Sequence, residues 1–543
     1  MAWPNKGLAH RPVVMGRRGA VASAHPLASL AGQRMLMAGG NAIDAAVAIA
    51  AALNVVEPYM SGAAGVGYLF IYHAQSDTRI VLNYNGRSPW AAELSRFTSE
   101  DDKRSGILSP LVPGAVGGWL AALERYGTMD RATVFAPAIE YAAHGFPLTI
   151  NNHQFFTAAE ETLNRWPISA ATYLHGGKAP LPGAILTQPN LARTLRQIVE
   201  GGADAFYRGP IGAAIVRFSE QHGGLLTQRD LDDFAVEWVE PIGVNYRGYD
   251  VYCPPPPCSG IQYLQTLNLV EGFDMAGLGH NSAPYIHHFA EAMKLAVADR
   301  TTFAPAPNPP TDTLLSKEYA AMRRALIGPT HAGVSGGDRF TSRKRADEVR
   351  AGNPYAMPQS TTHFDALDAA GNAVSATQTL GAVFGSGVVF GETGLALNNF
   401  LYWMDRDPES PNAIAPHKHA EQCLSPAQVW KNGKPFMVIG TPGSFGIMET
   451  TPQMLLNVLD QEMSIQAAIE APRFRTGAGR ELPLEGRIPA EVREALTHLG
   501  HEVQVLPDWT MFVGGGQGIM VDPDSGAFLA GADPRRDGYA LAW

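Results

Sequence analysis

The chain has 543 residues and a formal net charge of −10 at pH 7, from 41 Lys and Arg against 51 Asp and Glu. Hydrophobic residues make up 45% of the sequence and charged residues 17%, a composition that excludes disorder over the whole chain and allows a large core. No dense basic block is present to neutralise a run of phosphates, so we expect no nucleic-acid partner. The length suits several domains or one large α/β unit.

The N-terminal part of the chain predicts two helices followed by a hairpin. Residues 26–39 have the pattern of a short helix, and residues 41–58 that of an Ala-rich helix. The glycine-rich turn 61–67 leads into a β-branched and aromatic strand at 68–72, for which residues 80–84 are the expected hairpin partner. Helices with such small side chains can pack closely together.

The most apolar stretch, residues 42–56, is interrupted by Asp44 and Asn54. It is shorter than the roughly 18 uninterrupted apolar residues that indicate a membrane span. Residues 1–20 contain no apolar core of signal-peptide length. We therefore expect a cytoplasmic protein without a membrane segment, in which residues 42–56 form a buried helix.

The middle of the chain is mostly helical in pattern. Helical spacing dominates residues 113–220, with 118–127 as the clearest amphipathic unit, and residues 285–303 form another helix. From residue 304 to 360 the sequence is rich in Pro and Gly and then strongly charged, which predicts an irregular, mobile connector. Residues 364–368 and 373–380 then predict a β-hairpin.

Three cysteines, Cys253, Cys258 and Cys423, are too few for a disulfide framework and lack the paired spacing of a zinc site. Their number favours a reducing compartment. Cys258 lies in a Pro-Cys-Ser-Gly sequence without an evident base, so we expect a structural role for it.

Thr361 stands at the start of the predicted hairpin, directly after the connector, where an N-terminal-nucleophile (Ntn) hydrolase is cut. A threonine hydroxyl is a weak nucleophile that needs a base, and a freed α-amino group with a pKa of about 8 can provide it. One residue then supplies both groups. Because threonines are also common in ordinary strands, this pattern alone does not decide between catalysis and sheet structure.

Twelve motifs in chain order resemble the γ-glutamyltransferase family, from about residue 19 to the C-terminus. They are residues 24–29, 38–46, 56–62, 112–114, 204–209, 259–260, 291–295, 361–363, 391–394, 398–399, 440–444 and 531–538. The resemblance implies an α/β (α+β) protein with the αββα Ntn-hydrolase sandwich. It also implies one precursor, cut between Ser360 and Thr361.

The same resemblance implies how the cut chain is organised. Residues 1–360 become a large subunit that ends in the connector 304–360, and residues 361–543 become a small subunit that begins with the nucleophile. The two fragments form a heterodimer, with a dimer of heterodimers as an open alternative. No cofactor or metal is implied, and the expected partner is a small-molecule amide.

Four catalytic positions carry over from the family. Thr361 is the expected nucleophile and, after cleavage, the α-amine base; Thr379, eighteen positions later in the sequence, matches the threonine that supports it. Gly443 and Ser444 occupy the place of a glycine pair whose backbone N–H groups form the oxyanion hole. The Cβ of Ser444 is expected to narrow that hole without removing its donors.

The groups with which family members hold the α-amino and α-carboxylate groups of a γ-glutamyl substrate are replaced here. The replacing residues are Gly381, Phe400, Tyr402, Trp403, Gln422 and Cys423. A buried ammonium group without an acidic partner is costly, so we expect a poor fit to γ-glutamyl substrates. Asp405 supplies the missing acidic partner only if its loop shifts register.

Arg87 is the candidate carboxylate clamp, although an ungapped match places the family's arginine at Asn85. The Gly-Arg-Ser-Pro sequence at 86–89 is similar to the branch that contains oxamate amidohydrolases. We therefore expect hydrolysis of a small, carboxylate-bearing, oxamate-like amide. The alternatives are γ-glutamyl hydrolysis or transfer on glutathione and related compounds, an acylase for a bulkier acyl group against Phe400, Tyr402 and Trp403, and a non-catalytic family member.

Three rival signals are weaker. Residues 333–337 match the Gly-x-Ser-x-Gly pattern around Ser335, but they lack the strand and helix that this motif needs. His287, His288 and Glu291 have metal-ligand spacing on one helix, and helix packing is the favoured interpretation. His363 is expected on the same strand face as Thr361, with either a supporting or a packing role.

Overall fold

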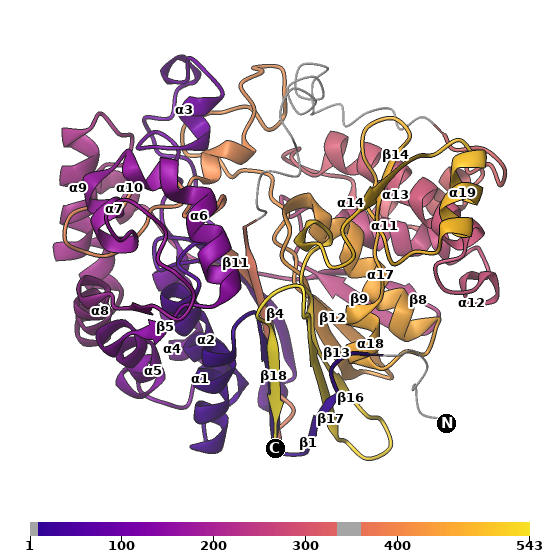
Figure 1. Ribbon diagram of the computed structural model, residues 1–543, viewed down its shortest axis with the longest axis horizontal. Coiled ribbons are helices and arrows are strands. Elements are labelled where there is room, and N and C mark those ends of the chain that lie inside the picture. Colours follow the sequence, from indigo (N-terminus) through magenta and orange to yellow (C-terminus); the bar gives the residue numbers. More distant parts are fainter. Residues whose placement is uncertain (1–8, 334–359) are drawn as a thin grey trace.

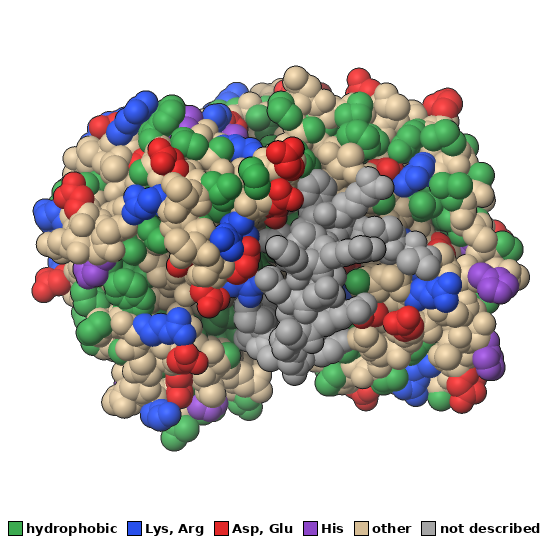
Figure 2. Space-filling model, turned by 90° about the horizontal axis from the view of Figure 1, so that it is seen from above, with side chains coloured by type: hydrophobic (Ala, Val, Ile, Leu, Met, Phe, Trp, Pro, Cys, Tyr) green, Lys and Arg blue, Asp and Glu red, His purple; other side chains and the backbone are tan. Residues whose placement is uncertain are grey.

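The computed structural model describes residues 9–333 and 360–543. Within these residues two seven-stranded antiparallel sheets stack face to face, and a layer of helices covers the outer side of each sheet (Figure 1). The result is a four-layer αββα sandwich, as the sequence predicts. On the upper face, Lys and Arg side chains are interspersed with Asp and Glu among the described residues (Figure 2).

Each sheet combines strands from distant parts of the chain. The first sheet has the order β18 (Tyr539–Ala542), β2 (Gly19–Ser23), β10 (Thr362–Asp368), β11 (Ala373–Thr379), β3 (Val66–His73), β4 (Thr78–Asn83) and β7 (Glu237–Val239). The second sheet has the order β1 (Val14–Gly16), β17 (Phe528–Ala532), β16 (Gln517–Val521), β13 (Lys434–Gly440), β12 (Ala427–Lys431), β9 (Tyr249–Cys253) and β8 (Ile242–Tyr246).

The helices divide between the two sides of the sandwich (Figure 1). On the side of the first sheet are α1 (Pro26–Met37), α2 (Ala42–Val56), α3 (Asp101–Arg104), α4 (Ala115–Tyr126), α5 (Arg131–His144), α6 (Ile150–Asn164), α7 (Pro167–Tyr173), α8 (Pro189–Tyr207), α9 (Pro210–Gln221) and α10 (Gln228–Asp232). On the side of the second sheet are α11 (Ile261–Val270), α12 (Met275–Leu278), α13 (Ala283–Phe303), α14 (Thr311–Leu314), α15 (Lys317–Arg324), α17 (Ile447–Leu459), α18 (Ile465–Glu470) and α19 (Ala490–His498). Two small sheets, β5 (Phe146–Pro147) with β6 (Ile185–Leu186) and β14 (Glu481–Glu485) with β15 (Glu502–Leu506), complete the fold.

Helix α2 is buried along its whole length and packs on β10 and β11, which confirms the buried Ala-rich helix. Its start is fixed by a capping box, in which the Asn41 side chain accepts from the backbone of Asp44 and Asp44 accepts from the Asn41 N–H. Asp44 also accepts hydrogen bonds from the backbone N–H groups of Thr128 and Met129. Further along the helix, Asn54 accepts from the Ala63 N–H at 2.7 Å. The polar residues that interrupt the apolar stretch therefore tie the helix to its surroundings.

The β10–β11 hairpin confirms the prediction for residues 364–380 and is attached to α2. Gly371 adopts a φ of 90° in its turn, a conformation that suits glycine. Asp368 accepts from the Asn372 N–H with one carboxylate oxygen and from the Ala42 N–H with the other. The hairpin turn thus meets the first turn of the helix that covers it.

Strands from before and after the predicted cleavage site alternate in both sheets. In the first sheet β10 lies between β2 and β11, and β11 lies between β10 and β3. In the second sheet β12 pairs with β9, and β17 pairs with β1. A break before Thr361 therefore leaves the backbone hydrogen bonds of both sheets in place.

The prediction of an irregular connector over the whole of 304–360 is wrong for the part that the structure describes. Helices α14 and α15 form there because Leu314 and Ala304 are buried against Ile261 and because Ser316 caps α15 by accepting from the Tyr319 N–H. Residues 334–359, with Ser335 and its Gly-x-Ser-x-Gly motif, lie outside the described residues.

Among the described helices, none combines the length and apolar character that crossing a bilayer requires. The three cysteines are unpaired and buried. The Cys258 thiol donates to the Leu424 carbonyl, and burial raises its pKa to about 12. Its surroundings suit the structural role expected from the sequence.

We expect Asp44→Ala to destabilise the fold, because it removes the buried carboxylate that completes the capping box of α2 and that accepts from the backbone N–H groups of residues 128 and 129. The expected loss is about 2–4 kcal/mol, measured as a lower midpoint of chemical unfolding. Asp130→Ala is the matched control, since Asp130 caps α5 at an exposed position. An equal midpoint for the two variants would contradict this account of α2.

Candidate active site

Thr361 lies directly before β10 in the space between the two sheets, and only 2% of its surface is exposed. The next residue, Thr362, faces the helices, because its hydroxyl donates to Glu57 at the end of α2. Successive strand residues face opposite sides, so Thr361 faces the second sheet. Its Oγ1 donates to Thr379 Oγ1 at 3.3 Å, and Thr379 Oγ1 also accepts from the Gly381 N–H at 2.8 Å. The structure thus brings the two predicted threonines together.

The backbone of Thr361 is held on both sides of its Cα atom. The Arg536 guanidinium donates to the Thr361 carbonyl at 2.9 Å. The Thr361 N–H donates to the sulfur of Met60 at 3.3 Å, and Arg536 donates to the same sulfur at 3.5 Å. Just before Thr361, the Ser360 hydroxyl donates to the Gly381 carbonyl at 2.5 Å.

Thr361 has a φ of 147°, a value that L-residues rarely adopt and that is most unfavourable for a β-branched side chain. Such a conformation costs about 1–3 kcal/mol and persists only where the surroundings impose it. The torsion φ is defined by the carbonyl carbon of Ser360. Breaking the Ser360–Thr361 bond therefore releases this strain.

The predicted oxyanion residues follow the end of β13. Gly440, the last residue of β13, packs against the His363 ring of β10 across the sheets. From this contact the two chains continue toward the same end of the sandwich, to Thr361 on one side and to Gly443 on the other. The Gly515 N–H donates to Thr441 Oγ1 at 2.9 Å, and Gly515 packs on Arg536, which binds Thr361. The loop after β13 and Thr361 thus border the same region.

Gly443 and Ser444 have φ values of 133° and 58°. Glycine adopts the first of these without strain, whereas the left-handed conformation costs a serine about 1–2 kcal/mol. The serine expected to narrow the hole is therefore also conformationally strained.

Gly381 occupies a position where only glycine fits. Its φ is 105°, and a Cβ atom there would lie 2.1 Å from Asn399 Oδ1. The Asn399 side chain accepts from the Ala382 N–H and donates to the Arg104 carbonyl. It is therefore fixed in place, and the space next to Thr379 holds no side chain from residue 381.

The aromatic segment Phe400–Trp403 forms a 3₁₀ turn. In space it lies between Gly381 and the loop that follows β13. Phe400 and Leu401 are buried in the core. The Trp403 ring contacts the Phe445 ring edge to face, with centroids 5.0 Å apart, and Phe445 follows Ser444 directly. Among the described residues the Trp403 indole N–H has no hydrogen-bond partner. The segment forms an apolar wall between the threonine pair and the predicted oxyanion loop.

Gln422 and Cys423 are buried, and neither supplies a charge to this region. Gln422 donates to the Tyr68 hydroxyl at 3.0 Å, and burial raises the pKa of the Cys423 thiol. Asp405 accepts from the Ser410 hydroxyl at 2.7 Å within its own loop.

Arg87 and Asn85 border a separate cavity of about 200 Å³, together with His417, His419 and Glu237. The Arg87 guanidinium lies 3.1 Å from Glu237, which also lies 3.1 Å from His419. Hydrogen bonding to His419 and Arg87 lowers the pKa of Glu237 to about 2. Asn85 donates to the Gly67 carbonyl and to Asn83.

This cavity lies at the same end of the first sheet as Thr361, but further along it. Arg87 follows β4, and β11 and β3 lie between β4 and β10. At about 4.8 Å per strand, the chains that carry Arg87 and Thr361 are about 14 Å apart. The structure does not bring Arg87 into contact with the threonine pair.

His363 lies in the interface between the sheets. Its Nδ1 is 2.9 Å from Thr377 Oγ1, and its Nε2 is 3.1 Å from the Asp365 carboxylate. It shares the strand face of Thr361, as predicted, and its contacts are those of a packed interface residue.

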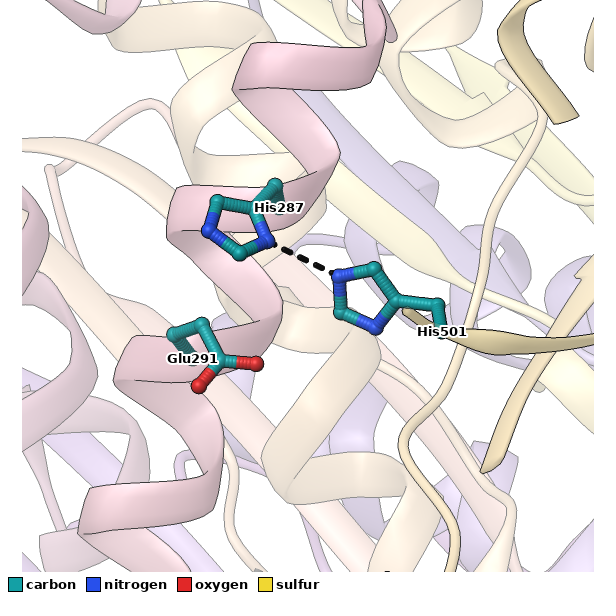
Figure 3. A group of neighbouring side chains, drawn as sticks. All are labelled: His287, Glu291 and His501. Atoms are coloured by element: carbon teal, nitrogen blue, oxygen red, sulfur yellow. Dashed lines mark hydrogen bonds between the residues drawn. The ribbon is translucent and has the colours of Figure 1, made fainter. Parts of the chain in front are cut away.

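Two of the predicted metal-spaced residues, His287 and Glu291, lie in a polar cluster with His501, which comes from a distant part of the chain (Figure 3). Their ligand atoms lie within 4.8 Å of one another. His287 Nδ1 and His501 Nε2 are hydrogen-bonded at 2.9 Å. His288 is directed elsewhere and bonds to the Pro284 carbonyl.

The converging atoms of this cluster already have protein partners. Lys294 donates to one carboxylate oxygen of Glu291 at 2.7 Å, and the Gly333 N–H donates to the other at 3.0 Å. His287 Nε2 lies 2.7 Å from the Gly328 carbonyl. An ammonium group beside the carboxylate also disfavours a cation, so we interpret the cluster as packing.

Three residues with direct contacts in this site, Glu57, Met60 and Arg536, were not assigned a role from the sequence. They lie within the motifs 56–62 and 531–538, which are part of the family resemblance. The sequence therefore marked these segments, but not the contacts that their residues make. The contacts were not predictable because α2 and the β17–β18 loop meet Thr361 only in the folded chain.

The comparison with a family model described as Gamma-glutamyltranspeptidase matches residues 28–543. The chain belongs to the gamma-glutamyltranspeptidase family. It is 38% identical to the Acylase ACY 1 proenzyme of Pseudomonas sp. (strain SE83), over 97% of this chain and 94% of the relative. It is 35% identical to the Glutathione hydrolase-like YwrD proenzyme of Bacillus subtilis (strain 168), over 97% and 99% of the two chains.

A solved structure agrees with the model of this family member. The cephalosporin acylase from Bacillus halodurans superposes with a TM-score of 0.90 at 34% identity, covering 99% of this chain and 98% of that one. The Ntn-hydrolase sandwich predicted from the sequence is thereby confirmed, and the chain is a hydrolase of this family.

We expect Gly381→Ala to lower the rate of amide hydrolysis, and of any self-cleavage, at least tenfold. The added Cβ would meet Asn399 and displace the backbone of residue 381, which binds the Ser360 and Thr379 hydroxyl groups. The measurement is the fraction of cut chain over time on a denaturing gel. Gly433→Ala is the control, since Gly433 also has a positive φ of 72° but nothing lies within 4 Å of its Cβ position. Equal behaviour of both variants would show that crowding at residue 381 is irrelevant.

Proposed function

We propose that this family member cuts itself before Thr361 and then hydrolyses amide bonds with Thr361 as nucleophile, on acyl groups other than γ-glutamyl. The observation that carries the proposal is the buried Thr361–Thr379 pair at 3.3 Å, in which Thr361 directly precedes β10 and has the strained φ of 147°. The proenzyme names of both curated relatives support the self-cleavage.

In self-cleavage, Thr361 Oγ1 attacks the carbonyl carbon of Ser360 and the C–N bond to Thr361 breaks, which leaves an ester. Water then hydrolyses the ester, so that Ser360 ends in a carboxylate and Thr361 begins with a free α-amine. The interleaved strands keep residues 1–360 and 361–543 together as a heterodimer.

In the amide reaction, the α-amine takes the proton of Oγ1 as this oxygen attacks the substrate carbonyl carbon. Backbone N–H groups of Gly443 and Ser444 receive the negative charge on the tetrahedral oxygen. The proton passes to the departing amine as the C–N bond breaks. Water then resolves the acyl-enzyme and releases a carboxylic acid.

The substrate preference follows from the wall beside the threonine pair. Gly381, Phe400 and Trp403 offer no acidic group for the α-amino group of a glutamyl substrate, so burying that ammonium group beside them is costly. The Arg104 guanidinium, 5.2 Å from the centroid of the Tyr402 ring, would add repulsion. Trp403 and Phe445 instead provide an apolar surface, with the indole N–H as a hydrogen-bond donor. We therefore favour a bulkier, largely apolar acyl group, in accord with the acylase names of two relatives.

A small carboxylate-bearing amide of the oxamate type is the second candidate. It is favoured by Arg87, which is 41% exposed and borders a cavity. A carboxylate there must compete with Glu237 for the guanidinium, and the strand that precedes Arg87, β4, is about 14 Å from β10. This candidate therefore needs a movement of Arg87 toward Thr361.

We expect purified wild-type protein to run as two fragments, the smaller of which begins Thr-Thr-His-Phe on N-terminal sequencing. Thr361→Ala should give a folded, uncut and inactive chain, because it lacks the hydroxyl. Thr361→Ser should retain slower cleavage. Ser335→Ala is the control and should be cut like the wild type. An uncut Ser335→Ala chain beside a normally cut Thr361→Ala chain would make Ser335, and not Thr361, the nucleophile for cleavage.

We expect phenylacetyl-p-nitroanilide to be hydrolysed with a kcat/KM at least about 100-fold above that of γ-glutamyl-p-nitroanilide, because only the second substrate brings unpaired charges into the site. Trp403→Ala should lower kcat/KM for the phenylacetyl substrate selectively. Oxamate turnover that falls in Arg87→Ala but not in Trp403→Ala would favour the second candidate. Preferred hydrolysis of the γ-glutamyl substrate would overturn both.

A further inference from the structure

Arg536 is the charged side chain in direct contact with the backbone of Thr361. The residue is only 3% exposed, and its guanidinium donates to the Thr361 carbonyl at 2.9 Å. It shares the Met60 sulfur with the Thr361 nitrogen, at 3.5 and 3.3 Å. The nitrogen that becomes the catalytic α-amine therefore lies a few ångströms from a buried positive charge.

The loop that carries Arg536 is held rigidly by buried ion pairs. Asp533 pairs with Arg473 and with Arg535, and Arg535 pairs with Glu485 at 2.6 Å. The Gly516 N–H also donates to Asp533. Arg536 is thus presented to Thr361 from an anchored backbone.

Glu57 is the buried acid on the helix side of the same strand. It accepts the Thr362 hydroxyl at 3.0 Å and interacts electrostatically with Arg536. Burial raises the pKa of Glu57 to about 7, against the opposing effect of Arg536. The strand therefore begins between an acid that binds Thr362 and a cation that binds Thr361.

We propose that Arg536 is the positioning residue for the nucleophile: its hydrogen bond fixes the Thr361 carbonyl, and its charge keeps the freed α-amine in the base form. Glu57 is the counter-charge that allows Arg536 to be buried. The proposal rests on Thr361 being the nucleophile, which the cleavage and Thr361→Ala experiments test separately.

The sign of the charge effect follows from Coulomb's law. A positive neighbour disfavours the ammonium form and lowers the pKa of an amine, whereas an ionised acid raises it. The other groups that face Arg536 are Glu57, Tyr59, Asp533 and Asp537. Asp533 is paired with two arginines, and Asp537 accepts hydrogen bonds from Thr149 and Asn151. Arg536 is therefore a cation whose charge is not cancelled by these acids and which shares a contact atom with the Thr361 nitrogen.

The test compares pH profiles of kcat/KM for the cut enzyme in the wild type and three variants. In Glu57→Gln the cation remains. In Glu57→Gln/Arg536→Met both charges are absent, so no unpaired charge is buried. We expect the acid limb of the double variant to lie about 1 pH unit above that of Glu57→Gln. In Arg536→Lys we expect the acid limb to stay near the wild type, with kcat lowered about tenfold or more, because lysine keeps the charge but not the hydrogen-bond geometry.

Glu291→Gln is the matched control, because it neutralises a buried, lysine-paired acid in the cluster of Figure 3 and should leave the profile unchanged. A folded double variant that stays uncut would support the positioning role, since cleavage also needs Thr361 in place. If the double variant does not fold, the test rests on Arg536→Lys. A wild-type kcat together with a wild-type pH profile of kcat/KM in this variant would overturn the proposal. Coincident acid limbs for Glu57→Gln and the double variant would also overturn it.

Discussion

The pairing of β10 with β2 on one side and β11 on the other holds Thr361 in place whether or not the bond before it is intact. Residues 362–367 pair with β11, and residues 364–368 pair with β2, so the register is set by strands on both sides. A chain end is normally mobile. Here the strand that follows Thr361 lies inside the sheet, so a cut before Thr361 would leave this residue in a fixed position.

A second constraint is the desolvation of charge at the same end of the sandwich. Isolated charges in such a position are costly, and removing one partner of a buried pair typically costs about 3–5 kcal/mol. The protein meets this cost with paired groups: Arg473, Arg535, Asp533 and Glu485 satisfy one another, and Arg536 is balanced by Glu57. The rigidity that these pairs provide is what allows a guanidinium to be aimed at a single carbonyl.

The apolar wall beside Thr361 and Thr379 shows how the residue at one position depends on its neighbours. Asn399 fills the space beside residue 381, and glycine is the residue that this space and a φ of 105° accommodate. The aromatic segment that follows Asn399 then packs Phe400 into the core and directs Trp403 to Phe445. The glycine at position 381 and the apolar surface next to it are therefore parts of one local packing arrangement.

The sequence by itself determined the elements whose signals are local. The helical pattern of residues 41–58 and the alternation of residues 364–380 predicted α2 and the β10–β11 hairpin, because helix ends, strand alternation and hairpin register depend on near neighbours. The pairing of Thr361 with Thr379 was implied by the family resemblance. The helices at 311–324 were missed, since their stability comes from burying Leu314 against Ile261, a contact made only after folding.

Only the tertiary structure decided which side chains surround Thr361. The contacts of Arg536 and Glu57 with Thr361 and Thr362 join residues 175 and 305 positions apart. It also decided that Arg87 pairs with Glu237, and that His501 rather than His288 joins His287 and Glu291. The physical reason is the same in each case: a sequence pattern specifies which face of an element a residue occupies, whereas the partner on that face is selected when separate elements pack together.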